Sequence, residues 1–359
     1  MTKTNKIYLI GCMLAATACS GPEAKAQDIH FSQFYENAIL RNPALTGIFS
    51  GDYKAGVNYR TQWSNISAPF KTILASAETR VAVNKEVGDY ISFGATATYD
   101  RAGSINFNSM QIYPAINYNK AMADGHRSYL SIGFTGGYIQ RSYDLSKATY
   151  SSQYANGQYD PLRPSGENMT NTSLQYFDLG AGMSFNSTIG EAHMVNYYIG
   201  AAAYHVAKPK ETFAGDQDML RLDTKWNGNL GIRAAFNEQY SLIVHVNYSQ
   251  QGPYQEIIGG GLVSWHTRSE SIYNFAVYAG CFLRVKDALI PTIKLDYDKY
   301  SITMSYDVNT SSLKPATNGT GGYEMSLYIR GNYKHNDRMG GQVACPRFEQ
   351  MLDHSATDF

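Results

Sequence analysis

The sequence predicts an all-β, antiparallel, up-and-down transmembrane outer-membrane β-barrel of about fourteen strands. Three observations predict it: short segments of alternating apolar and polar residues, an N-terminal export signal, and the lack of a long apolar run. In the segment 301–308, for example, Ile302, Met304, Tyr306 and Val308 alternate with polar residues. Because successive side chains of a strand point to opposite faces, such a segment has one apolar and one polar face.

The composition fits this class. Charged residues make up 17% of the 359 residues, below the roughly 25% that is usual for soluble domains. The 29 tyrosines suit a membrane–water interface, but a secreted soluble β protein rich in Tyr and Gly would show similar totals. The formal net charge is zero, which gives no electrostatic reason to expect nucleic acid as a partner.

The first 26 residues have the pattern of a signal peptide. Two lysines precede the apolar stretch Ile7–Ala18, which is too short to span a bilayer as a helix, and the sequence at 24–26 is Ala-Lys-Ala, a small-x-small cleavage site. We expect cleavage after Ala26, so that the mature chain begins at Gln27. A lipoprotein signal, with Cys19 as the lipidated residue, is the alternative.

Two cysteines remain in the mature chain, Cys281 and Cys345. Their spacing in the sequence matches no metal-binding pattern. A disulfide bond between them is an alternative that an oxidising compartment would allow. No stretch after residue 26 reaches 18 consecutive apolar residues, which argues against membrane-spanning helices.

We expect four parts in chain order: a signal peptide at 1–26, an N-terminal segment at 27–52, the barrel at 53–331 and a periplasmic C-terminal tail at 332–359. The stretch Asp28–Ser50 lacks clean alternation. It is therefore predicted to form a short helix or loop that packs against the barrel, with a plug as one role.

Fourteen segments carry the strand pattern. They are Tyr53–Trp63, Phe70–Ala82, Tyr90–Arg101, Phe107–Lys120, Arg127–Tyr143, Thr172–Ser187, Ala192–Val206, Thr224–Phe236, Tyr240–Gln250, Gln255–Thr267, Ser271–Lys286, Leu289–Asp298, Lys299–Asn309 and Gly322–Arg330. Strands of about ten to fifteen residues suit a tilted membrane span, whereas soluble strands average about five or six.

The lengths of the connections support this strand count. All the long connections have odd numbers in chain order, namely Asp144–Asn171, Ala207–Asp223 and Thr310–Gly321. Single-chain outer-membrane barrels have short periplasmic turns and longer external loops. We therefore expect the long connections outside the cell and both termini in the periplasm.

The polar face of the strands is rich in Ser, Thr, Asn and Gly and is expected to carry few charges. This favours a narrow or filled lumen over a porin with a charged constriction. Aromatic residues at strand ends, such as Tyr53 and Trp63, either form an interfacial girdle or reflect the ordinary strand propensity of aromatic residues.

Several motifs in combination resemble those of the PorP/SprF family. They are Phe31-Ser32-Gln33-Phe34-Tyr35, Asn42-Pro43-Ala44-Leu45-Thr46-Gly47, Tyr59-Arg60-Thr61-Gln62-Trp63, Ser305-Tyr306-Asp307-Val308-Asn309, Gly321-Gly322-Tyr323-Glu324-Met325-Ser326-Leu327 and Cys345-Pro346-Arg347-Phe348. The resemblance spans about Gln27 to Phe348. It implies an outer-membrane protein of Bacteroidetes that is linked to type IX secretion and, in many members, to gliding motility.

The resemblance also implies partners. SprF-like members secrete or attach large surface adhesins that carry a type B C-terminal sorting domain, and PorP-like members associate with periplasmic, peptidoglycan-binding components. We therefore expect a non-enzymatic barrel in outer-membrane lipid, without cofactor, that anchors or helps export such an adhesin. The rival hypothesis is a transport barrel for a small or hydrophobic solute with an N-terminal plug.

Candidate contact residues follow from the longest connection and from one motif. Large amphipathic side chains make good contact groups at low entropic cost; in and beside the connection they are Tyr143, Tyr150, Tyr154 and Tyr159. They could instead shield the barrel mouth, and the partner could instead enter the lumen or the periplasmic end. Arg60 and Trp63 lie on opposite faces of a strand, where Arg60 could anchor the N-terminal segment or contact a partner.

No catalytic motif is recognisable. The sequence has no Gly-x-Ser-x-Gly elbow, no His-Glu-x-x-His helix and no Walker loop. Asp296 and Asp298 could act as an acid–base or calcium pair, although a solvated surface pair is the simpler interpretation. His245 is expected to face the lumen as a lone side chain.

Overall fold

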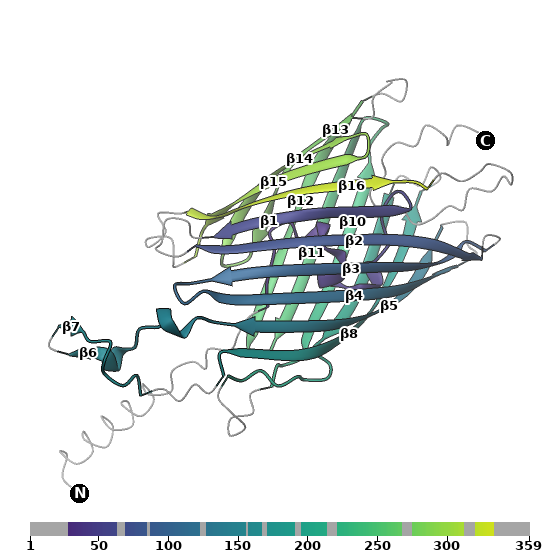
Figure 1. Ribbon diagram of the computed structural model, residues 1–359. Coiled ribbons are helices and arrows are strands. Elements are labelled where there is room, and N and C mark those ends of the chain that lie inside the picture. Colours follow the sequence, from purple (N-terminus) through teal and green to yellow (C-terminus); the bar gives the residue numbers. More distant parts are fainter. Residues whose placement is uncertain are drawn as a thin grey trace, which may run out of the picture.

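The computed structural model describes residues 28–62, 69–84, 87–122, 127–155, 157–166, 171–190, 195–213, 221–267, 275–311 and 320–333. Within these ranges, fourteen strands close into one antiparallel barrel (Figure 1), which confirms the predicted fold class and strand number. Successive barrel strands pair along the chain, and β1 closes the barrel against β16. None of the described helices is long and apolar enough to cross a membrane.

The barrel strands are 10 to 17 residues long. They are β1 (Tyr53–Gln62), β2 (Phe70–Asn84), β3 (Asp89–Ala102), β4 (Phe107–Ala121), β5 (Tyr129–Ser142), β8 (Ser173–Ile189), β9 (Val195–Tyr204), β10 (Lys225–Ala235), β11 (Tyr240–Gln251), β12 (Tyr254–His266), β13 (Phe275–Arg284), β14 (Ala288–Tyr297), β15 (Tyr300–Asn309) and β16 (Thr320–Gly331). Each predicted segment overlaps one of them, with bounds that differ by a few residues.

The alternation places apolar side chains outside and polar side chains inside. On β15, Met304 is 54% exposed on the outer surface, whereas Ser301 and Thr303 are buried. On β16, Leu327 is likewise 43% exposed. This arrangement is the reverse of a soluble β protein and matches a wall that faces lipid outside and polar contents inside.

The two ends of the barrel differ. One end, called the long-loop end below, carries the connections 143–172, 205–224 and 310–319. The other end, called the turn end, carries connections such as 85–88, 236–239 and 298–299. This asymmetry confirms the predicted alternation of short and long connections.

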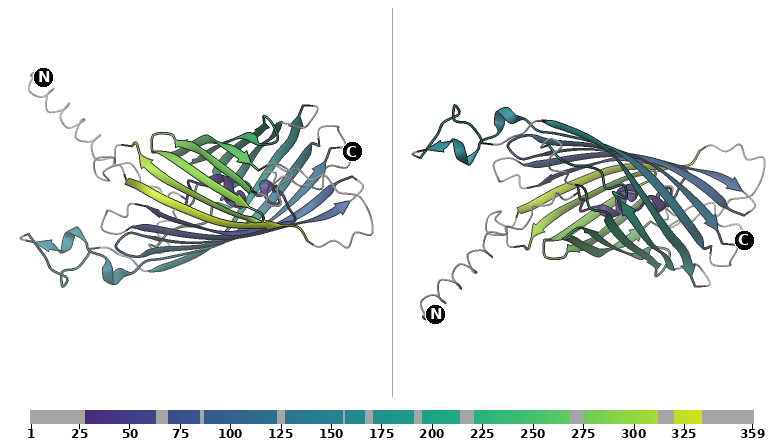
Figure 2. Two further views of the ribbon diagram at one scale, coloured as in Figure 1. Left: turned by 90° about the horizontal axis from the view of Figure 1, so that it is seen from above. Right: turned by 90° about the horizontal axis from the view of Figure 1, so that it is seen from below.

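A small hairpin within the first long connection was not expected from the sequence. It consists of β6 (Tyr154–Ala155) and β7 (Gln158–Tyr159), which pair with each other and form a sheet separate from the barrel. The hairpin lies well away from the barrel wall (Figures 1 and 2). Its strands are too short to show a periodic pattern, which is why the alternation did not reveal them.

The stretch before β1 lies inside the barrel (Figure 2). Residues 28–52, called the lumen segment below, contain the 3-10 helix η1 (Phe34–Glu36), the one-turn helix α2 (Ala38–Arg41) and the 3-10 helix η2 (Pro43–Leu45). The side chain of Asn42 caps η2 by accepting a hydrogen bond from the amide of Ala44. The expected short helix is therefore confirmed.

The lumen segment crosses the barrel from end to end. At the long-loop end, Asp28 lies beside His205 and Lys225, which flank the connection between β9 and β10. At the turn end, the amide of Asp52 donates to the carbonyl of Gly331, 2.7 Å away. Asp28 and Gly331 therefore lie at opposite ends of the barrel. The chain ends themselves lie outside the described residues, and the expectation that both are periplasmic stays a prediction.

Several sequence-based expectations fall outside the described residues. They concern the signal peptide with its cleavage site after Ala26, the alternative lipidation of Cys19, the pairing of Cys281 with Cys345, the side chain of Trp63, and the C-terminal tail beyond Tyr333. They stay predictions.

Candidate functional site

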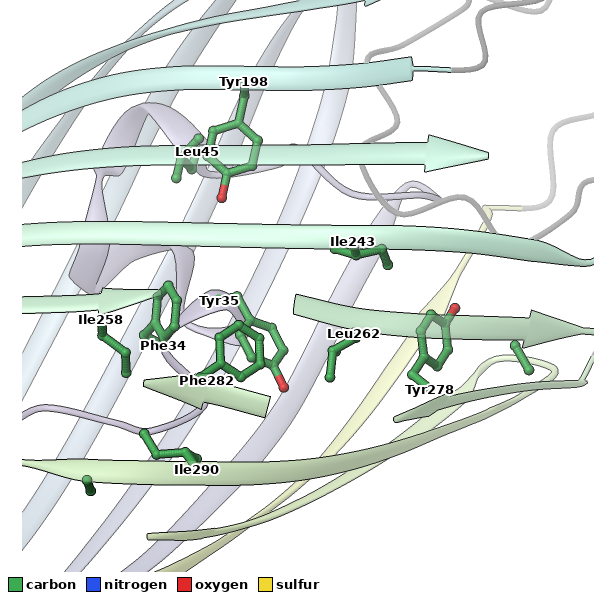
Figure 3. Close-up of a cluster of buried hydrophobic side chains, with 12 residues drawn as sticks. Phe34, Tyr35, Leu45, Tyr198, Ile243, Ile258, Leu262, Tyr278, Phe282 and Ile290 are labelled. Atoms are coloured by element: carbon green, nitrogen blue, oxygen red, sulfur yellow. The ribbon is translucent and has the colours of Figure 1, made fainter. Parts of the chain in front are cut away.

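The lumen is occupied along one side by an apolar cluster built around η1 (Figure 3). The Phe34 ring meets Phe282 of β13 edge-on, with centroids 5.6 Å apart. The Tyr35 ring stacks on Phe282 at 5.1 Å and on His245 of β11 at 5.1 Å. His245 faces the lumen, as expected. Such ring pairs add to the area they bury, so this cluster fixes η1 against the wall.

A set of buried charges holds the start of the lumen segment. This Glu324 cluster consists of Ser32, Arg60, Arg284, Asp307 and Glu324. Glu324 accepts the Ser32 amide at 2.7 Å and pairs with Arg60 at 3.1 Å. Asp307 pairs with Arg60 at 2.9 Å and with Arg284 at 3.1 Å. The Ser32 hydroxyl donates to Asp307 and accepts from both guanidinium groups.

These charges are nearly inaccessible to water, since Arg60 is 1% and Glu324 0% exposed. Removing one partner from such a set leaves an uncompensated buried charge, which costs several kcal/mol. The contact of Arg60 with Ser32 confirms that Arg60 anchors the lumen segment. Contact of Arg60 with a separate partner stays a prediction.

A second set of charges, the Glu36 cluster, lies nearer the turn end. Glu36 is 1% exposed and pairs with Lys294 of β14 at 2.8 Å and with Lys54 of β1 at 3.1 Å. Beside it, the hydroxyl of Tyr328 on β16 donates to Asn37 at 3.0 Å. Charge-assisted hydrogen bonds of this kind are stronger than neutral ones, so the cluster fixes the middle of the lumen segment.

The Asn-Pro-Ala-Leu-Thr-Gly motif fits the wall closely. Asn42 is fully buried and donates to the carbonyl of Met183 on β8 at 3.1 Å. Gly47 has a φ of +82°, and a β-carbon there would overlap the side chain of Ser92. Its amide donates to Glu78 at 2.8 Å. Glycine is therefore required at position 47 both for its backbone conformation and for space.

A third set of charges lies at the mouth of the long-loop end. The His205 ring lies between two carboxylates, 2.9 Å from Asp28 and 2.8 Å from Asp178, and Lys225 lies 3.2 Å from Asp28. Burial alone would lower the pKa of His205, but the two carboxylates outweigh it and raise the pKa to about 9. Burial would likewise raise the pKa of Asp28, but Lys225 and His205 hold it far below its usual range.

The expectation of few charges on the inner face was wrong. Buried charged side chains on the barrel strands are Lys54, Arg60, Glu78, Arg80, Asp89, Arg141, Asp178, Arg233, Arg284, Lys294, Asp296, Asp307, Glu324 and Arg330. Each strand contributes only a few of these residues, so no single segment of the sequence has a high content of charged residues. Only closure of the barrel brings them together around the lumen segment.

The interpretation of Asp296 and Asp298 as a solvated pair was wrong for Asp296 and correct for Asp298. Asp296 is 4% exposed inside the barrel, whereas Asp298 is exposed in the turn between β14 and β15, at a φ of +51°. The strand ends at Tyr297, so the two side chains do not share a strand face. Among the described residues, no group of three His, Cys, Asp or Glu side chains could hold a metal ion.

Two cavities beside the lumen segment are small. One of about 30 Å³ is lined by residues that include Arg41, Lys54 and Tyr198, and one of about 20 Å³ by residues that include Asp28 and Tyr113. Each has room for only one or a few water molecules. Neither is large enough to hold a folded peptide or a hydrophobic solute.

The candidate tyrosines of the first long connection divide into two groups. Tyr154 and Tyr159 pair across the β6–β7 hairpin with ring centroids 5.4 Å apart, and they are 58% and 40% exposed. Tyr143 is half-buried and meets the Phe213 ring edge-on at 4.9 Å, which links two long connections. Tyr150 is half-buried at the start of a 3-10 turn. The hairpin therefore carries the accessible pair.

The sequence alone did not identify Ser32, Glu36, Arg284, Lys294 or Glu324 as partners of one another. Ser32 and Glu324 both lie within the motifs that carry the resemblance, and that coincidence was the available signal. The remaining three lie in stretches without a motif. Their convergence depends on strand register and on the path of the lumen segment.

Comparison with known proteins supports the sequence-based resemblance. A family model described as type IX secretion system membrane protein PorP/SprF matches residues 23–328. No curated protein matches the chain.

Several solved barrels are similar at low identity. The Ralstonia pickettii toluene transporter TbuX has a TM-score of 0.47 at 10% identity, over 82% of this chain and 93% of that one. A Pseudomonas aeruginosa FadL homologue has a TM-score of 0.46 at 10% identity, over 80% and 91%. The P. putida toluene transporter TodX has a TM-score of 0.39 at 10% identity, over 82% and 93%. At these values, what those barrels carry says nothing of this one.

Proposed function

This chain is an outer-membrane β-barrel that belongs to the PorP/SprF family of type IX secretion system membrane proteins, and from that premise we propose that it anchors or helps export a large cell-surface adhesin with a type B C-terminal sorting domain. Its family implies association with components of the type IX system. In the proposed role the barrel is a non-enzymatic holder rather than a channel.

The filled lumen is the observation that carries this proposal. The lumen segment is held by the Glu324 cluster, the Glu36 cluster and the apolar cluster around Phe34. A lumen segment that is held at several depths by buried ion pairs suits a rigid membrane-embedded platform, because each ion pair would have to break before the lumen opened.

The surface at the long-loop end is the proposed docking surface for the adhesin. The β6–β7 hairpin presents Tyr154 and Tyr159 together with Leu162, which is 92% exposed. Aromatic residues on a projecting loop are frequent anchors of protein interfaces. In this arrangement the long loops face the cell exterior, and the turn end faces periplasmic components of the system.

The first experiment is purification of the tagged protein from native outer membranes in mild detergent, with mass spectrometry of what accompanies it. A large surface protein with a type B sorting domain, recovered in near-equimolar amount, is the expected result. Recovery of the barrel alone, both directly and after chemical cross-linking on cells, would contradict the proposal.

A matched pair of variants localises the contact. The double substitution Tyr154→Ala and Tyr159→Ala should reduce recovery of the adhesin at least ten-fold without changing the amount of barrel, because two paired aromatic anchors at about 1–2 kcal/mol each are lost. Tyr240→Ala is the control, since Tyr240 is 45% exposed at the turn end. Equal loss in the control, or none in the double variant, would exclude the hairpin as the docking surface.

The rival function, transport of a small or hydrophobic solute past a movable plug, makes a different prediction. Transport requires that the intact protein, whose lumen segment is present but able to move, conducts ions or takes up solute. Planar-bilayer recordings of the intact barrel therefore separate the two functions, and conductance steps in the intact protein would favour transport.

A further inference from the structure

The first and last contacts of the lumen segment lie at opposite ends of the barrel, while in between the carbonyls of Ile39 and Arg41 accept from Tyr204 and Asn227 in the long-loop half of β9 and β10. Asp28 meets His205, which directly follows β9 at the long-loop end. Ser32 lies next, on Arg60 and Arg284, near the ends of β1 and β13 at that same end. Glu36 then meets Lys54, near the beginning of β1.

The rest of the lumen segment completes the crossing. Arg80, three-quarters of the way along β2 toward the turn end, donates to the carbonyl of Phe49 at 3.1 Å. The Asp52 amide then bonds to Gly331, where β16 ends. An extended chain advances about 3.3 Å per residue, so a segment of this length is ample to cross a membrane-spanning barrel even with three helical turns in it.

We infer that this protein threads its own N-terminal side through its lumen, so that Asp28 emerges on the cell surface among the long loops while β16 ends on the periplasmic side. The assignment of Asp28 to the cell surface rests on the proposed orientation of the barrel in the membrane. The placement of Asp28 and Gly331 at opposite ends of the barrel does not depend on that orientation. The Asp28 side chain, which is 20% exposed, then lies at the edge of the surface that the long-loop end offers to a partner.

The closing seam of the barrel holds the threaded segment. Glu324 of β16 accepts the Ser32 amide, while Asn58 of β1 donates to the same carboxylate at 2.8 Å. Lys54 of β1 and Tyr328 of β16 hold Glu36 and Asn37. Both strands of the seam therefore touch the segment, so the place where the barrel closes is also a place where the segment is held.

The mouth retains the emerging chain. The Asp28 carboxylate is held by the His205 ring and by the Lys225 ammonium group, and the buried hydroxyl of Tyr204 donates to the carbonyl of Ile39 further in. These contacts hold Asp28 at the long-loop end. This differs from a loosely held plug, whose end would sample both sides.

Labelling of single cysteines on intact cells tests the inference. Three variants, Asp28→Cys, Leu162→Cys and Glu238→Cys, are made in a background that carries Cys281→Ala and Cys345→Ser. Leu162 marks the long-loop end, and Glu238 is exposed in the turn between β10 and β11 at the turn end. A membrane-impermeant maleimide is applied to intact cells and to cells with a permeabilised outer membrane.

The expected result is that the Asp28→Cys and Leu162→Cys variants react on intact cells at least ten-fold more than the Glu238→Cys variant, which reacts only after permeabilisation. If the Asp28→Cys variant instead behaves like the Glu238→Cys variant while the Leu162→Cys variant reacts on intact cells, the inference is overturned. If the Glu238→Cys variant alone reacts on intact cells, threading stands and the proposed orientation fails.

A second measurement covers the case in which the Asp28→Cys variant reacts in neither preparation. A short epitope inserted between Gln27 and Asp28 is then detected with antibody on intact and permeabilised cells, against the same epitope inserted after Leu162 as reference. Detection on intact cells supports threading. Detection only after permeabilisation, with the reference detected on intact cells, overturns it.

Discussion

At the scale of single residues, Glu324 concentrates the contacts that hold the lumen segment. Its carboxylate accepts the amides of Ser32 and Gln33 at 2.7 and 3.0 Å, the Asn58 side chain at 2.8 Å, and the Arg60 guanidinium at 3.1 Å. An ionised carboxylate can accept several hydrogen bonds at once, which a neutral amide cannot reproduce.

The substitution Glu324→Gln should therefore lower the free energy of unfolding by about 3–5 kcal/mol, because it leaves Arg60 undercompensated in a buried site. The measurement is urea unfolding of the purified barrel in detergent. Glu238→Gln, in an exposed turn, is the control and should change the value by no more than about 0.5 kcal/mol. Equal stability of Glu324→Gln and the parent protein would show that the cluster contributes little.

His205 should make the stability of the mouth depend on pH. Its pKa in the folded protein is about 9, above the ordinary value of 6.5. The folded state therefore holds a proton that the unfolded chain releases, so the stabilisation is fully present below pH 6.5 and is lost as the pH rises through 9.

The expected result is a fall in the thermal unfolding temperature of the parent protein between pH 6.5 and 9, with a smaller fall in a His205→Gln variant. Heat-dependent migration in detergent gels and circular dichroism both measure it. Parallel pH profiles for the two proteins would mean that His205 is not the group responsible.

At the scale of elements, the outer face of β15 and β16 tests the membrane assignment. Met304 pairs with Met325, and Leu327 pairs with Ile302, so the outer surface here is continuous and apolar. Met304 and Leu327 are 54% and 43% exposed, so both side chains face outward.

The double substitution Met304→Arg and Leu327→Arg should impair membrane assembly, at about 2–4 kcal/mol for each arginine near the bilayer midplane. The amount of heat-modifiable barrel in the outer membrane measures it. Met304→Leu with Leu327→Met keeps both sites apolar and should assemble normally. Normal assembly of the arginine variant would show that these two positions do not face lipid.

At the scale of the whole molecule, the lumen segment occupies the barrel interior and changes its charge. It brings three acidic residues, Asp28, Glu36 and Asp52, and one arginine, Arg41, into a wall whose buried charged residues are eight basic and six acidic. The segment thus partly neutralises a basic lining while it fills the lumen. A water-filled lumen with that lining would favour anions.

We therefore expect planar-bilayer recordings to show no stable steps for the intact protein, and steps with anion preference for a variant that lacks residues 28–50. If that variant does not assemble, the double variant Glu36→Gln and Glu324→Gln, which loosens both clusters, serves in its place. Cation-preferring steps would contradict the charge argument, and identical recordings of intact and altered proteins would contradict the role of the segment as a stopper.

The sequence by itself determined the barrel class, the number of strands, their facing and the two unequal ends. These properties depend on period-two alternation and on connection lengths, which are local and can be read along the chain. The motifs also indicated the family, and a lumen anchor was one of the two roles that the sequence left open for Arg60.

Only the tertiary structure decided the path of residues 28–52 and the ion pairs that fix it. Ser32 and Glu324 lie 292 positions apart, and such a contact arises from strand register and from closure of β1 on β16, which no local pattern records. For the same reason, the sequence led us to expect few charged side chains on the inner face of the barrel. Single charges on separate strands form a network around residues 28–52 only in the closed barrel.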